Sequence, residues 1–220
     1  TKMKQFDVQF TLSYSGGTSE DHKIDLYDVS QALIGFQRSL ALTTHLVLNG
    51  KIITQSPSLK GAEIYALPAA EGSWKINAGI LILGTAAYQL GTTPGNTPLG
   101  HLIFSTYDYV ISESLGYHVD YNKSLGQLNE EYKKKNIILP TIRRGQLDSL
   151  VEKCSIAITE MHRPIYKTKT ATTGRISSKI NNIPVPIKPI ISFDTFQYII
   201  EEYEADITEE ICDRWFQYVR

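Results

Sequence analysis

The residues best suited to bind a ligand form a basic segment near the end of the chain. Six basic residues and no acidic one lie between positions 161 and 193. Within 167–175, Lys and Arg stand beside four threonines and one glycine. Cationic side chains supply positive charge for a phosphate, and hydroxyls and the backbone at a flexible glycine supply hydrogen-bond donors for its oxygens. The segment therefore predicts a nucleic-acid or nucleotide-phosphate site at Arg163, Lys167, Lys169, Arg175 and Lys179.

An acidic segment offers the alternative explanation for these charges. Residues 194–220 contain eight acidic and two basic residues. The basic segment would then pair with the acidic one, in the same chain or in a neighbouring subunit. A formal net charge of −1 and the lack of interleaved aromatics across 167–179 favour this pairing over a strong nucleic-acid site.

Histidines supply the only candidate for metal chemistry. A metal-dependent hydrolase would need His101, His118, Asp120 and His162 to converge. His162 ends a predicted helix, where the dipole favours the charged imidazole, so capping is the simpler interpretation. We therefore predict no metal and no cofactor.

No catalytic motif is readable in the sequence. It contains no nucleophile elbow, Walker loop, zinc-protease signature or dinucleotide fingerprint. Cys154 and Cys212 lie among apolar neighbours, which is typical of small buried thiols. With no secretory signal evident, we expect a reducing, cytoplasmic location and lean against an enzyme.

A long uncharged region occupies the middle of the chain. Residues 76–107 contain no Asp, Glu, Lys or Arg. They are interpreted as a buried strand plus a buried helix face, or as a subunit interface formed by Ile80, Ile82, Leu83 and Leu90. A membrane-inserting hairpin is the least favoured alternative, because glycines and Pro94 interrupt any bilayer-length helix.

These candidates must be positioned by strands and helices that hydrophobic periodicity predicts. Residues 4–14 alternate, with Phe6, Val8, Phe10, Leu12 and Tyr14 on the buried face of a strand. A long helix begins at Asp28, its N-cap, and ends at Asn49-Gly50. The remaining predicted elements are strands at 62–67 and 74–83, helices at 98–115, 124–135, 144–162 and 193–203, and an extended run at 165–192.

These elements predict an α+β fold: a mostly antiparallel sheet with a covering long helix and an adjacent helical bundle. The sequence divides into a sheet part at 1–96, a helical part at 97–164, and an extended and acidic part at 165–220, unless all three form one compact domain. Apolar residues up to Arg220 predict either that the full gene product continues or that this end docks on a partner.

Three stretches, 71–75, 97–109 and 162–165, together resemble a group of bacterial hypothetical proteins carrying a domain of unknown function. The resemblance covers roughly residues 1–200 and transfers no catalytic residue. It implies a longer protein with a small β-rich C-terminal part, and a place in mobile or anti-phage gene clusters.

The favoured function is a non-enzymatic interaction or assembly protein, acting in defence, which binds itself or another protein through 76–107 and 161–220. The alternatives are a nucleic-acid or nucleotide-phosphate binder, a metal-dependent hydrolase and a membrane-perturbing effector.

Overall fold

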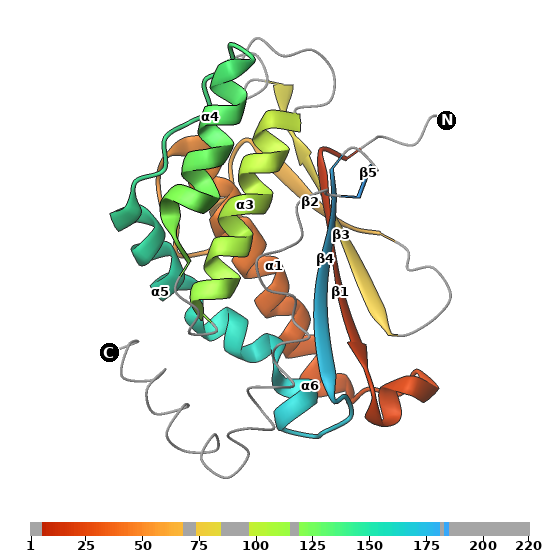
Figure 1. The fold of residues 1–220 in the computed structure, drawn as a ribbon. Coiled ribbons are helices and arrows are strands. Elements are labelled where there is room, and N and C mark those ends of the chain that lie inside the picture. Colours follow the sequence, from red (N-terminus) through yellow and green to blue (C-terminus); the bar gives the residue numbers. More distant parts are fainter. Residues whose placement is uncertain (1–5, 68–73, 85–96, 115–118, 181–182, 185–220) are drawn as a thin grey trace.

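The computed structural model describes residues 6–67, 74–84, 97–114, 119–180 and 183–184. An antiparallel sheet stands on one side and helices on the other (Figure 1). Its strand order is β2-β3-β1-β4-β5. The strands are β1 Val8–Ser15, β2 Ala62–Leu67, β3 Lys75–Ile82, β4 Thr173–Ile180 and the two-residue β5 Ile183–Pro184.

The helices lie against a single face of this sheet (Figure 1). They are α1 Leu26–Asn49, α3 Thr97–Ser114, α4 Gln127–Lys134, α5 Arg144–Met161 and α6 Arg163–Tyr166, with short turns η1 Gly17–Asp21, η2 Ser56–Ser58 and the π-helical η3 Asn122–Gly126. The predicted α+β fold with an antiparallel sheet, a long covering helix and further helices is confirmed.

The connectivity is a split βαβ arrangement. The chain runs β1–α1–β2, and β3 then returns between these two strands, antiparallel to both. After α3, α4 and α5, β4 pairs antiparallel with the other side of β1. The order β2-β3-β1-β4 is that of the ferredoxin-like β-α-β-β-α-β motif, with additional helices before the last strand.

Strand β1 shows the predicted alternation. Val8, Phe10, Leu12 and Tyr14 are buried against the helices, and the residues between them are partly exposed. Burying each large apolar side chain contributes roughly 1.5–3 kcal/mol. The prediction for Phe6 is wrong: it precedes β1, and its ring lies on the opposite face, over Gly79.

Helix α1 is capped at both ends, although not by the predicted N-terminal residue. The Asp25 carboxylate accepts a hydrogen bond from the Asp28 N–H at 2.9 Å, so Asp25 is the N-cap and Asp28 belongs to the first turn. Gly50, at φ +65°, ends the helix as predicted by donating its N–H to Leu46 at 2.8 Å.

Helices α1 and α3 contact the sheet, and α5 packs against both of them. Helices α1 and α5 approach each other closely at Gly35. A Cβ on Gly35 would lie 2.1 Å from the carbonyl oxygen of Ala157, so only glycine fits there. This close approach holds α5 against the layer that covers the sheet.

The other predictions have mixed outcomes. Residues 165–166, expected to start the extended run, belong instead to α6, because Pro164 occupies a favoured first-turn position of that helix. The three-part division stays a prediction, although β4 of the third part pairs with β1 of the first. The predicted helix at 193–203 lies outside the described residues. Within the described part, no helix has the length and apolarity to cross a membrane.

Candidate functional site

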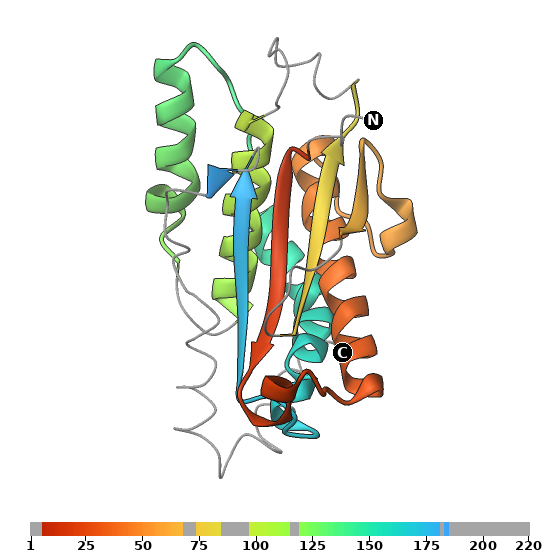
Figure 2. The same cartoon turned by 90° about the vertical axis from the view of Figure 1, so that its right-hand side faces the viewer.

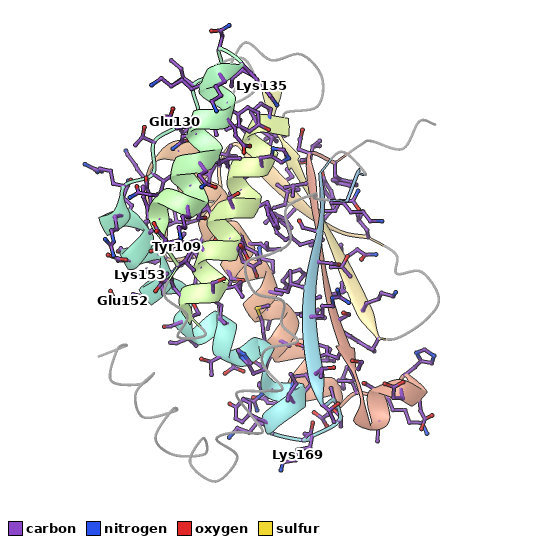
Figure 3. The ribbon with its side chains drawn as sticks, viewed as in Figure 1. Tyr109, Glu130, Lys135, Glu152, Lys153 and Lys169 are labelled. Carbon is purple, nitrogen blue, oxygen red and sulfur yellow. The ribbon has the colours of Figure 1, made fainter. Side chains whose placement is uncertain are left out.

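The five basic residues predicted to bind phosphate separate into two groups. Arg163, Lys167 and Lys169 lie in or next to α6, where the chain turns from the helices back toward the sheet. Figure 3 shows Lys169 at this end of the molecule. Arg175 and Lys179 lie on β4. The segment is therefore not one continuous binding strip.

Arg163 is engaged within the chain. Its Nε donates to the buried carboxylate of Asp28 at 3.0 Å, and its Nη1 donates to Glu160 at 3.3 Å. The guanidinium also lies 5.1 Å from the ring centroid of Tyr27. These contacts join α6 to the start of α1 and engage the guanidinium within the chain, and the phosphate contact of Arg163 stays a prediction.

The threonine-rich loop before β4 is also used internally. The Thr170 carbonyl accepts the Ser19 N–H at 2.8 Å, and the Thr172 N–H donates to Ser15 at 2.9 Å. The Thr168 N–H donates to Asp28 at 3.3 Å. The loop therefore closes the end of the sheet onto η1, and the N–H groups of Thr168 and Thr172 donate within the chain rather than to a phosphate.

Arg175 and Lys179 have a different environment on the face of the sheet opposite the helices. Figure 2 looks onto this open face, with β4, β1 and β3 side by side in front of the helices. Arg175 pairs in register with Ser13, and Lys75 of β3 pairs with the same Ser13 from its other side. Because facing residues point to the same side, the two cations flank Ser13 on the open face.

The three cations on this face, Lys75, Arg175 and Lys179, have no carboxylate partner among the described residues. Strands β1, β3 and β4 contain no acidic residue. The Cα atoms of Lys75 and Arg175 are two strand spacings apart, about 10 Å, and Lys179 lies about 13 Å farther along β4. This arrangement concentrates positive charge on one surface.

Uncharged polar side chains fill the centre of the open face. Thr11 donates to the Asn77 side-chain oxygen at 2.6 Å. By register, Thr11 also faces Ser177. Hydroxyl and amide groups between cations provide hydrogen-bonding capacity without competing negative charge.

An aromatic pair lies at the β2 side of the same face. The rings of Phe6 and Tyr65 are 5.9 Å apart and inclined by 55°. Gly79 lies beneath Phe6, where a Cβ would approach the ring to 2.7 Å. Tyr65 is 43% exposed, and its hydroxyl donates to Glu63, the one acidic residue of the described strands.

One family model matches the chain, over residues 10–200, and its description is a domain of unknown function, DUF7946. The chain belongs to the DUF7946 family. This confirms the resemblance to an uncharacterised family. No curated protein and no solved structure matches the chain.

The histidines of this DUF7946 protein do not converge, within the described residues, on the metal site that the hydrolase alternative would require. No group of three His, Cys, Asp or Glu side chains there is arranged to hold a metal. His101 shares a hydrogen bond with the Tyr132 hydroxyl, and Asp120 accepts the Asn122 N–H at 2.9 Å. His118 lies outside the described residues.

Burial shifts the pKa of His162 and the pKa of Cys154 in opposite directions. Burial lowers the pKa of His162 to about 4, which disagrees with the predicted charge of the imidazole, whereas its predicted capping role is confirmed, because His162 is the C-cap of α5. Its Nδ1 lies 2.8 Å from the Ile158 carbonyl, to which it donates. Burial raises the pKa of the Cys154 thiol to about 12. Both groups are therefore neutral.

The predicted interface residues lie in different environments. Ile80 and Ile82 are 0% and 5% exposed and face the helices of the same chain, which corrects their assignment to an interface. Their burial matches the buried-strand alternative. Leu83 is 37% exposed, and Leu90 lies outside the described residues.

Sequence reasoning missed Lys75, Phe6 and Tyr65 as members of the open face. The alternation of β1 already indicated a polar face at Gln9, Thr11 and Ser13. The register with β3 and β4 adds the cations to that face, and register between distant strands is not readable from periodicity.

Proposed function

We propose that this protein is a non-enzymatic binding protein that recognises an anionic macromolecule on the open face of its sheet. The observation that carries the proposal is the arrangement of Lys75, Arg175 and Lys179 on that face. Among the described residues none of the three has a carboxylate partner. Charge complementarity of this kind attracts polyanions and raises association rates.

The candidate catalytic groups support a binding role. Cys154 is buried and protonated, and His101 shares its Nδ1 with Tyr132. The polar groups at the centre of the open face include no histidine, cysteine or carboxylate. Such a surface is suited to recognition by charge and hydrogen bonding.

The biological setting is part of the same proposal. A reducing cytoplasm fits the buried free thiol of Cys154. The anti-phage role implied by the family resemblance and self-association through 76–107 and 161–220 stay predictions.

Neutralising the open face tests the proposal. The variant Lys75→Gln/Arg175→Gln/Lys179→Gln should bind inorganic polyphosphate at least about tenfold more weakly than the wild type in low salt, because it loses three charge contacts. Calorimetric titration measures the affinity, and thermal melting confirms that the variant is folded.

A matched control removes the same charge elsewhere. Lys123, Lys133 and Lys153 are exposed on η3, α4 and α5, and Lys153 lies on the side away from the sheet (Figure 3). Changing these three lysines to glutamine should preserve most of the wild-type affinity for polyphosphate. Equal losses in the two triple variants, or no polyphosphate binding by the wild type, would contradict the proposal.

A further inference from the structure

We infer that the anionic partner is single-stranded nucleic acid, whose bases stack on Phe6 and Tyr65 while its phosphates contact Lys75, Arg175 and Lys179. This inference rests on the proposed function and names its ligand class. Two kinds of chemistry share the open face, and a polyanion without bases would use only one of them.

The first argument is the position of the aromatic pair. Tyr65 pairs in register with Gly79, and Gly79 pairs with Gln9 of β1. Phe6 takes the space above Gly79 that a side chain would fill. Two rings thus lie side by side on a surface whose centre is otherwise polar, and aromatic rings of this kind form stacking platforms for unpaired bases.

The second argument is the alignment of platform and cations. Gln9 also pairs with Lys179, so one row across four strands runs from Tyr65 through Gly79 and Gln9 to Lys179. This row spans about 14 Å at ordinary strand spacing. Arg175 and Lys75 lie in a parallel row, about 13 Å away. A face of this size accommodates about two or three nucleotides.

The third argument concerns the form of the nucleic acid. In a duplex the bases are paired and stacked inside, and their faces cannot reach Phe6 and Tyr65 on a flat sheet. A single strand can place a base on the rings and a phosphate beside Lys179. The hydroxyl and amide groups of Thr11, Asn77 and Ser177 then lie between these contacts, next to sugars and base edges.

The topology of the sheet offers an analogy to known RNA-binding domains. Four-stranded antiparallel sheets that carry aromatics on an open face bind single-stranded RNA in a widespread module. The split βαβ topology also hosts many unrelated functions. The inference therefore depends on the side chains of the open face.

Removing the aromatic rings of Phe6 and Tyr65 separates the contribution of base stacking from the contribution of charge to oligonucleotide binding. The variant Phe6→Leu/Tyr65→Leu keeps apolar cover on Gly79 but loses both aromatic faces. It should bind a labelled single-stranded 12-mer at least about tenfold more weakly by fluorescence anisotropy, and polyphosphate with unchanged affinity. Leu67→Ala, also on β2, provides a control that removes an apolar side chain without removing a ring.

The outcomes distinguish the two proposals. Polyphosphate binding without oligonucleotide binding would overturn this inference and leave the proposed function standing. Equal affinity for a duplex and for a single strand, preference for polyglutamate, or full 12-mer affinity in the ring-free variant would also overturn it. Failure of every polyanion to bind would overturn both.

Discussion

Single residues decide how the two faces of this sheet differ. Gly79 lacks a side chain, which lets Phe6 occupy the open face. Asp7 helps to hold Phe6 on that face. Its carboxylate accepts the Ile82 N–H at 2.7 Å, and its own N–H donates to the Ile80 carbonyl at 3.0 Å. These contacts anchor the chain beside β3 just before β1 begins.

The neutral state of His162 predicts a pH dependence of stability. Burial lowers its folded pKa to about 4, whereas an unfolded histidine titrates near pH 6.5. The unfolded state therefore binds the proton more readily, and the stability from this residue is fully present above about pH 6.5 and lost as the pH falls to about 4. The loss should reach about 3 kcal/mol.

Urea unfolding at several pH values measures this effect. The variant His162→Asn keeps an N–H donor for Ile158 but does not titrate, so its stability should change less between pH 7 and pH 4.5. Exposed His22, at φ +59°, tolerates asparagine and provides the matched control. A wild-type pH profile in His162→Asn would show that another group is responsible.

At the scale of elements, the α1–α5 contact brings two backbones close together. Gly35 lies against the Ala157 carbonyl. We expect Gly35→Ala to destabilise the protein by about 1–3 kcal/mol, because the added methyl group meets backbone that cannot move independently. Denaturant unfolding monitored by circular dichroism measures the change.

Gly145 provides the comparison for this substitution. It lies in the first turn of α5, and an added Cβ there would meet nothing within 4 Å. Gly145→Ala should be neutral or stabilising by up to about 1 kcal/mol, because alanine favours helix. Similar destabilisation by both substitutions would mean that close packing at Gly35 is unimportant.

The local sequence pattern predicted where the helices and strands lie better than it predicted which of them pair in the fold. The bounds of β2 match the predicted strand, and the alternation of β1 and the stop at Gly50 are also confirmed. Phe6 fitted the period of β1 but left it, because Gly79 offers space on the other face. The pairing of β1 with β4 joins residues more than 150 positions apart, and no local signal encodes it.

For the same reason, only part of the candidate site could be predicted. Arg175 and Lys179 stood out by charge, and the structure places them on the open face. Arg163 looked equivalent in the sequence, but Asp28 is its partner across the fold. The role of Lys75 is not readable from the sequence, because it depends on pairing with Ser13 opposite Arg175.

At the scale of the whole molecule, the described helices all lie on one side of the sheet. The opposite face has three cations, a polar centre and one aromatic pair (Figure 2). A sheet needs only one buried face to be stable, and none of the described helices covers the other. The account therefore assigns folding to one face and binding to the other.

The salt dependence of oligonucleotide binding tests this assignment most directly. Each phosphate neutralised on a single strand contributes about 0.7 to the slope of log K against log salt concentration. Removing the charges of Lys75, Arg175 and Lys179 should lower the magnitude of that slope by about 2, whereas the Lys123, Lys133 and Lys153 control keeps the wild-type slope. An unchanged slope in the open-face variant would contradict the account, because the phosphates would then be contacted elsewhere.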